Sequence, residues 1–377
     1  MKLTAAAAAL VAAVICGCGG TAHSHASVRR SGELAGVCPA TVTIQTDWFP
    51  EADHSEAYAI AASGGTIDAK HKRYTAELMD GPLDTGVRVQ IRAGGPAIGY
   101  QLPTQQMYED HSIMLGYVST DQAIRDAGRQ PTLSVVAPRE RWAEILMYDP
   151  AHYHFKTVAD VGRSGATVLA FQGVPWAAYL ADAGVLQRKQ IDQSYDGAPA
   201  RFLASGGKVV QEGFVTAEPW QYLHAVKQWR KPVAHLLLAD AGYDQYGDAL
   251  AIRKADLAKD SPCLRKLVPV IQRAQVAYAR HPARTDALIA RIAKEQNDGW
   301  VYPRALADYA AHVQVADGII GDGTSRTLGD FEAGRVQHII DVLRPVYERE
   351  HVAVPAGLVP GSMYTNAFVD RSITLPR

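Results

Sequence analysis

The sequence predicts an α/β protein in which mostly parallel sheets carry helices on both faces. Short apolar strands alternate with segments of helical periodicity along most of the chain, which is the pattern of parallel sheets joined by crossover helices. No repeat of about 20 to 50 residues is visible, which argues against a solenoid. A chain of 377 residues with 47% hydrophobic side chains can bury a large core, and at this length we expect two lobes.

Strands are expected where short apolar or alternating runs end in turn residues, as in Val42-Thr43-Ile44-Gln45. The same criterion gives strands at 42–46, 87–92, 113–116, 133–137, 145–148, 167–171, 213–216, 235–239 and 249–253. Helices are expected where apolar residues recur every three or four positions, often after a capping residue or a proline. They fall at 55–62, 101–109, 121–127, 175–183, 198–205, 218–228, 261–280, 284–294, 303–315 and 328–347, followed by an irregular tail from 352.

The most informative stretch is 47–58, which reads Asp-Trp-Phe-Pro-Glu-Ala-Asp-His-Ser-Glu-Ala-Tyr. It follows the first strand and precedes the first helix, so it lies at a strand's carboxyl end, where open α/β sheets bind ligands. Trp48 and Phe49 offer aromatic faces to a planar or cationic ligand, while Asp53 and His54 offer polar contacts. The alternative is a surface turn whose aromatic side chains cap the core.

The extreme N-terminus is typical of an export signal. Lys2 is followed by an apolar run, 3–15, which is shorter than the about 20 residues that a membrane-spanning helix needs. The run ends in Ile15-Cys16-Gly17-Cys18, which resembles a bacterial lipobox. We therefore expect a signal peptide at 1–17, lipidation of Cys18 and a flexible tether at 18–36, with plain secretion as the alternative.

Two further cysteines, Cys38 and Cys263, remain in the exported chain. Outside the cytoplasm an even pair favours a disulfide bond, which would tie the first strand to a helix in the C-terminal part of the chain. Two buried free thiols are the alternative.

Composition argues against a nucleic-acid partner. The formal net charge is −1, and the densest basic stretch, 70–73, is soon followed by Glu77 and Asp80, so we interpret it as a solvated face. No second apolar run approaches membrane-spanning length, so the membrane contact is expected to be the lipid alone.

The sequence offers little for catalysis. It contains no His-Glu-x-x-His, no Gly-x-Ser-x-Gly and no complete phosphate-binding loop. His152 and His154 have metal-like spacing but no third histidine nearby, so we expect a surface loop there. We therefore predict no catalytic residue, no metal and no cofactor.

Several of these features together resemble one family of binding proteins. The lipobox, the opening strand, the run Trp48-Phe49-Pro50-Glu51 with His54, and Ala217-Glu218-Pro219 after a strand resemble substrate-binding proteins of ABC transporters. The similar group is the type II periplasmic binding proteins for thiamine pyrimidine precursors, sulfonates, taurine and nitrate. The sequence is most similar to the pyrimidine-precursor branch. It departs from that branch at Glu51 and Ala217, where the branch has asparagine.

The resemblance implies a two-lobed fold with two hinge crossings and a ligand cleft between the lobes. The first lobe would comprise 37–138 and 239–377, and the second 139–238. Strand ends that converge on the cleft supply the candidate ligand contacts, which are Trp48, Phe49, Asp53, His54, Tyr58, Gly95, Tyr117, Ser119, Thr120, Gln172, Gly173, Trp176, Glu218, Trp220 and Tyr243.

Several of these contacts have structural alternatives. The amides of Gly94 and Gly95 could bind an anion, or the pair could form a plain tight turn. Ser119, Thr120 and Glu218 could equally cap helices. Trp176, Trp220 and Tyr222 could add stacking surface, and at least one of the three is expected to lie in the core.

The resemblance implies a monomeric, lipid-anchored extracytoplasmic protein that captures a small ligand and delivers it to an ABC transporter permease. Acidic and aromatic candidates favour a heterocyclic or amine-bearing ligand over a sulfonate or nitrate. The alternative is an extracytoplasmic enzyme or sensor on the same scaffold. A fungal enzyme branch of this fold carries a cysteine cluster that is absent from this sequence.

Overall fold

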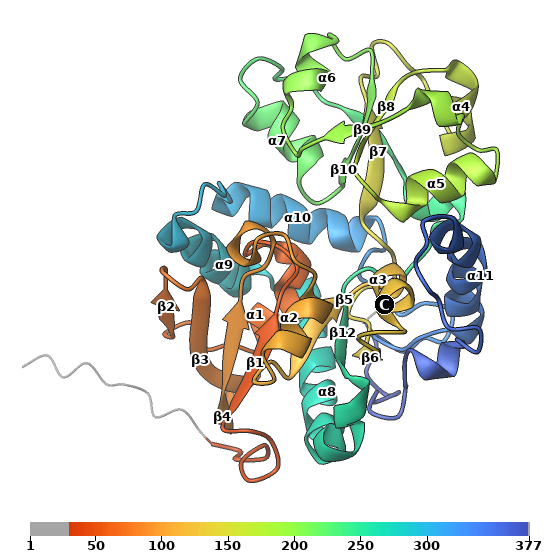
Figure 1. The fold of residues 1–377 in the computed structure, drawn as a ribbon. Helices are drawn as coiled ribbons and strands as arrows, with labels where there is room; N and C mark the ends of the chain where they lie inside the picture. The colour runs from red at the N-terminus through yellow and green to blue at the C-terminus, as the bar shows by residue number, and fades with distance from the viewer. Residues whose placement is uncertain (1–29, 376–377) are drawn as a thin grey trace, which may run out of the picture.

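Two β-sheets form the centres of two lobes (Figure 1) in the computed structural model, which describes residues 30–375. The first sheet has the order β2-β3-β4-β1-β5-β12-β6 and the second β11-β7-β10-β8-β9. The first contains β1 (Thr41–Gln45), β2 (Thr66–Asp68), β3 (Arg73–Asp80), β4 (Leu83–Arg92), β5 (Leu115–Val118), β6 (Thr132–Val136) and β12 (Ala249–Arg253). The second contains β7 (Glu144–Tyr148), β8 (Val168–Phe171), β9 (Ile191–Tyr195), β10 (Val210–Phe214) and β11 (Ala234–Leu237).

The α/β class with two sheets and flanking helices is confirmed, but the sheets are mixed rather than mostly parallel. Within residues 30–375, β1 pairs in parallel with β4 and β5, while the other four pairings of the first sheet are antiparallel. In the second sheet β8 is parallel to β9 and β10, and β7 is antiparallel to β10 and β11. The antiparallel pairs come from the β2-β3-β4 meander and from strands next to the crossings, which a pattern of apolar runs does not distinguish.

Helices cover the two sheets. Those of the first lobe are α1 (Ser55–Ala59), α2 (Pro103–Glu109), α3 (Thr120–Asp126), α8 (Leu257–Arg280), α9 (Ala283–Gln296), α10 (Arg304–Ala316) and α11 (Ala333–Arg349). Those of the second lobe are α4 (Val158–Ser164), α5 (Pro175–Asp182), α6 (Ala200–Ala204) and α7 (Glu218–His224). Short 3-10 turns lie at η1 (Ala52–His54), η2 (Gly95–Ile98), η3 (Arg188–Gln190), η4 (Leu238–Ala241), η5 (Lys254–Asp256) and η6 (Pro360–Ser362). No helix of the described part of the chain has both the length and the apolar character needed to cross a membrane.

Two segments connect the lobes. Residues 137–143 lead from β6 to β7, and residues 238–248 return from β11 to β12. The lobes also touch through helices: α10 lies on the side of the first lobe that faces the second, and α11 lies beside α3 and reaches α5 (Figure 1). One hydrophobic cluster accordingly contains side chains of both lobes, including Trp176 and Leu180 of α5 and Ile339 and Leu343 of α11.

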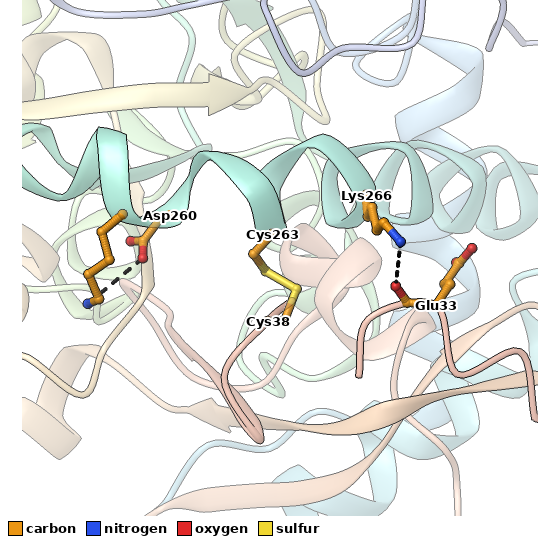
Figure 2. The surroundings of a disulfide bond; sticks show 6 residues. Glu33, Cys38, Asp260, Cys263 and Lys266 are labelled. Carbon is orange, nitrogen blue, oxygen red and sulfur yellow. Dashed lines mark hydrogen bonds and ion pairs between the residues drawn. A yellow bond between two sulfur atoms is a disulfide. The ribbon is translucent and has the colours of Figure 1, made fainter. Parts of the chain in front are cut away.

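The predicted disulfide joins Cys38 to Cys263, with their Cα atoms 4.7 Å apart (Figure 2). Cys263 is buried and lies inside α8 rather than at its start, because the helix begins at Leu257. Close to the bridge, Nζ of Lys266 donates a hydrogen bond to the carbonyl of Glu33 at 3.0 Å (Figure 2). The segment before β1 is thus fixed to the longest helix of the first lobe. The predicted lipidation site, Cys18, lies outside the described residues.

Candidate functional site

The loop after β1 is held in place by the Gly94-Gly95 turn after β4. The amide of Gly94 donates to the carbonyl of Trp48 at 2.8 Å, and the amide of Gly95 donates to the carbonyl of Asp47 at 2.8 Å. Gly95 has a φ of +56°, and a Cβ atom there would lie 2.8 Å from the Trp48 ring. Both amides are therefore used within the fold and are not free to bind an anion, while Gly95 provides the space in which Trp48 lies.

Of the two aromatic residues in the loop, only Trp48 keeps an accessible face. Phe49 is buried and stacks on Trp300, with ring centroids 5.2 Å apart, and Nε1 of Trp300 donates to the carbonyl of Pro50 at 3.2 Å. Trp48 is half-buried between Phe49 and the exposed Tyr100. Phe49 therefore caps the core, whereas Trp48 remains partly accessible and its ligand contact stays a prediction.

Five polar residues from three parts of the chain form what we name the Arg139 cluster: Asp47, Asp53, His54, Arg139 and Asp248. Arg139 and Asp248 come from the two crossings, and they are 3% and 5% exposed. Arg139 pairs with Asp248 and lies 3.3 Å from Asp53, while His54 lies 2.6 Å from Asp47. The cluster therefore links the loop after β1 to both connections between the lobes.

Burial and neighbouring charges shift the pKa values of this cluster in opposite directions. Burial raises the pKa of Asp248 to about 8, although the Arg139 guanidinium opposes the shift. Burial alone would lower the pKa of His54, but the hydrogen bond and the charge of Asp47 outweigh it, so that pKa is raised. Among the described residues, Nε and Nη2 of Arg139 and Nδ1 of His54 have no hydrogen-bond partner. A ligand that reaches the cluster would meet polar groups that the protein itself leaves unsatisfied.

The cluster also contains a possible metal-ligand set, since Asp47, His54 and Asp248 each bring one donor atom within 4.8 Å of the others. In the structure these donors satisfy one another and Arg139: His54 pairs with Asp47, and Asp248 pairs with the guanidinium. We therefore interpret the three residues as part of an ion-pair network.

Glu218 approaches from the second lobe. It is the first residue of α7, is half-buried, and its carboxylate accepts a hydrogen bond from the amide of Phe214 at 2.6 Å. Burial raises its pKa to about 7, and the charge of Asp53 in the first lobe adds to the shift. No described hydrogen bond or ion pair joins Glu218 to the Arg139 cluster, so the charge of Asp53 is the link between them. The hydrogen bond of Glu218 is local, so a structural role and a ligand contact are compatible.

Contacts between the lobes surround this junction. The hydroxyl of Tyr309 in α10 donates to the carbonyl of Val215 at 3.1 Å. Trp220 of α7 is half-buried and packs against the core of the first lobe. Trp142, in the first crossing, lies against Gly247 in the second and packs edge-on against Phe214. Trp220 therefore contributes to the contact between the lobes.

Besides His54, which is 1% exposed, four predicted contacts belong to the interior of the protein. Tyr58, Tyr117, Trp176 and Tyr243 are each at most 1% exposed, which leaves them almost no surface for a ligand. The hydroxyl of Tyr117 donates to Glu56 at 2.5 Å, and its ring packs edge-on against His54. These side chains support the site from behind.

Thr120 and Tyr243 fix the start of α3 to the return crossing. Tyr243 donates to Asp121 at 2.8 Å, and Oγ1 of Thr120 donates to the carbonyl of Tyr246 at 3.3 Å. Ser119 is the N-cap residue of α3 by position, but its hydroxyl donates to the Asp121 side chain instead of capping the helix. Gln172 and Gly173 lie exposed after β8, and no described contact joins them to the other candidates.

The structure also contains a pair of buried acids that the sequence did not indicate, Glu144 of β7 and Glu212 of β10. Nε1 of Trp142 donates to Glu144 at 2.7 Å, and the amide of Phe171 donates to Glu212 at 2.6 Å. Burial first, and then the charge of Glu212, raises the pKa of Glu144 well above its usual range. Each acid is the single carboxylate of an otherwise largely apolar strand, and this is the one sequence feature that could have identified it.

The structure also has two surface hollows. One of about 680 Å³ lies between α9 and α10 beside Trp300, and one of about 510 Å³ lies near Thr41 and Arg253. Neither is lined by a residue that the sequence suggested for ligand binding.

The chain was compared with known proteins. No protein-family model and no curated protein matches it. Solved structures do match. The alkanesulfonate-binding protein SsuA from Xanthomonas axonopodis pv. citri, bound to MOPS, is 15% identical with a TM-score of 0.51, covering 87% of this chain and 98% of that one.

Two further structures agree. The periplasmic aliphatic sulphonate binding protein SsuA from Escherichia coli is 17% identical with a TM-score of 0.52, covering 90% and 92% of the two chains. An ABC transporter protein from Parabacteroides distasonis is 12% identical with a TM-score of 0.52, covering 88% and 99%. At such low identity these matches establish the fold, and the chain therefore has the two-lobed fold of type II periplasmic binding proteins.

Proposed function

We propose that this protein is an extracytoplasmic solute-binding protein that captures a small heterocyclic or amine-bearing ligand between its lobes and delivers it to an ABC importer. The observation that carries the proposal is the buried Arg139 cluster, which links the loop of the half-buried Trp48 to both crossings and whose Asp53 acts electrostatically on the half-buried Glu218 of the second lobe. An aromatic face from one lobe and an acceptor from the other suit a ring that bears an amine.

The two solved SsuA structures are described as binding proteins for sulfonates, which supports a transport role for this fold. We propose a different ligand class here because the junction contains more carboxyl groups than cations. In this proposal 37–138 and 239–377 form one lobe and 139–238 the other, and the crossings at 137–143 and 238–248 act as hinges.

A thermal-shift screen of the mature protein tests the proposal, with pyrimidines, polyamines, aromatic amines, sulfonates and nitrate as separate groups. A ligand that binds only the folded state raises its stability by about 2.7 kcal/mol at a hundred times its dissociation constant. We expect a hit whose shift is lost in Trp48→Ala. Chemical conversion of the hit during incubation would contradict a pure binding role and favour an enzyme.

The proposed anchor is Cys18, with 18–36 as the tether. Cys18→Ala is expected to release the exported protein from the membrane fraction into the medium or periplasm. Retention of that variant on membranes would contradict the lipid anchor.

A further inference from the structure

We propose that Glu51 makes the junction selective for organic cations, an inference that rests on the proposed solute-binding function. Glu51 lies between Pro50 and η1 in the loop that also carries Trp48, and its side chain is half-buried. Its backbone carbonyl accepts a hydrogen bond from the amide of His54 at 3.2 Å. Its carboxyl group has no ion-pair or hydrogen-bond partner among residues 30–375, so the side chain contributes an unpaired acid to the site.

The electrostatic surroundings of Glu51 are acidic. The titratable and charged groups that interact electrostatically with Glu51 are Asp47, Asp53, Asp248, Arg139, Tyr58 and Tyr302. Arg139 is the single cation of this set and is already engaged by Asp53 and Asp248. Burial, followed by the charges of Asp53, Asp47 and Asp248, raises the pKa of Glu51 well above its usual range.

An acid in this position can hold either a proton or an organic cation. When an ammonium or amidinium group binds, the Glu51 carboxyl loses its proton to solvent, and the resulting carboxylate pairs with the ligand. Trp48 lies in the same loop, and a ligand that also reached its ring would gain a cation–π contact. A neutral ligand cannot displace the proton, and an anion would meet further negative charge.

The competing possibility is that an anion binds the free nitrogens of Arg139, as a sulfonate ligand would require. Nε and Nη2 of Arg139 do lack partners among the described residues. However, the guanidinium is buried and is already paired with Asp53 and Asp248, so an anion would have to displace these carboxyl groups to reach it. The same experiment can therefore decide between the two ligand classes.

Three ring compounds of similar size and shape provide the test: benzamidine as the cation, benzamide as the neutral form and benzenesulfonate as the anion. Calorimetric titration of the mature protein is expected to give benzamidine an affinity about tenfold or more above that of benzamide, with benzenesulfonate weakest. In Glu51→Gln, benzamidine and benzamide are expected to bind within about threefold of each other. Glu348→Gln, an exposed glutamate in α11, is the matched control and should keep the parent preference.

The proton provides a second readout. Titrations in two buffers of different ionisation enthalpy are expected to show proton release when benzamidine binds the parent, and less release in Glu51→Gln. The affinity of the parent for benzamidine should also rise with pH, because Glu51 must ionise to pair with the ligand. Asp248, Glu218 and His54 also titrate nearby, so we expect the slope to be reduced in the variant rather than abolished.

Several outcomes would overturn the inference: equal or tighter binding of benzamide or benzenesulfonate, no binding of benzamidine, or an unchanged preference in Glu51→Gln. Glu51→Asn serves as a second variant if the glutamine form melts early. The proposed function fails separately: it falls if the solute screen yields no ligand that depends on Trp48, or if the hit is chemically converted. A neutral or anionic hit that depends on Trp48 would preserve solute binding and remove the role of Glu51.

Discussion

Arg139 and Asp248 show how much of the candidate site could be predicted from individual residues. The loop of Trp48 and His54 could be predicted to lie at the sheet edge where such folds bind ligands, because it follows a strand and strand ends meet at one edge of a sheet. The pairing of Arg139 with Asp248 could not be predicted, because 109 residues separate them and only the adjacent crossings bring them together. A charged residue beside an apolar strand does not by itself indicate an ion pair. Its partner can be identified only from the structure.

The first prediction concerns this ion pair. Arg139→Met leaves Asp53 and Asp248 buried without their cation, so the free energy of unfolding should fall by about 3–5 kcal/mol in denaturant titrations at neutral pH. Arg163→Met, which removes an exposed pair with Asp160, should cost less than about 1 kcal/mol. Adding Asp248→Asn to Arg139→Met should recover part of the loss. Equal costs for the buried and the exposed arginine would contradict the prediction.

The second prediction concerns Glu218 and pH. Burial raises its pKa to about 7 in the folded protein, so folded Glu218 holds a proton that the unfolded chain has released between about pH 4.5 and 7. Its contribution to stability is therefore fully present below the unfolded pKa and is lost as the pH rises through the folded pKa. Glu218→Gln should reduce the fall in unfolding free energy over this window by about 1–3 kcal/mol. Urea titrations at several pH values measure it, and parallel pH profiles would contradict it.

At the scale of elements, strands and helices with strong apolar patterns were predicted to within a few residues, and those with weak patterns were missed. β3 alternates buried Tyr74, Ala76 and Leu78 with outward residues, but its basic start suggested a solvated face. β9 is an edge strand paired only with β8, so it needs few apolar residues, and β2 is three residues long. α4 is a short helix whose start depends on the Thr157 cap.

The third prediction concerns how the N-terminal segment is joined to α8. Replacing both Cys38 and Cys263 by alanine should lower the free energy of unfolding by about 2–5 kcal/mol, because the bridge spans 225 residues and restricts the unfolded chain. Reducing agent should destabilise the parent by a similar amount and leave the double variant unchanged. Parent and variant with the same unfolding midpoint under oxidising conditions would contradict a stabilising role for the bridge.

At the scale of the whole molecule, the sequence suggested two lobes and two crossings but not how extensively the lobes touch. The C-terminal helix α11 was expected to belong to the first lobe, whereas it packs on α3 and also on α5 of the second. Arg349 of α11 pairs with Asp182 at the end of α5. Such contacts join surfaces distant in sequence, and a hydrophobic pattern along one helix does not identify its partner. Several small interactions together therefore hold the lobes close to each other.

The last prediction concerns one of these interactions. Tyr309→Phe removes the hydrogen bond from α10 to the carbonyl of Val215, which joins the two lobes. A neutral hydrogen bond contributes about 0.5–1.5 kcal/mol, so the equilibrium between joined and separated lobes should shift by about 2–12-fold. Small-angle X-ray scattering of the ligand-free variant should show a larger radius of gyration, and the affinity for the ligand found by screening should fall by no more than the same factor. Tyr153→Phe is the matched control, because its hydroxyl donates to the carbonyl of Lys208 within the second lobe. If the two variants scatter and bind alike, the contact between Tyr309 and Val215 does not hold the lobes together.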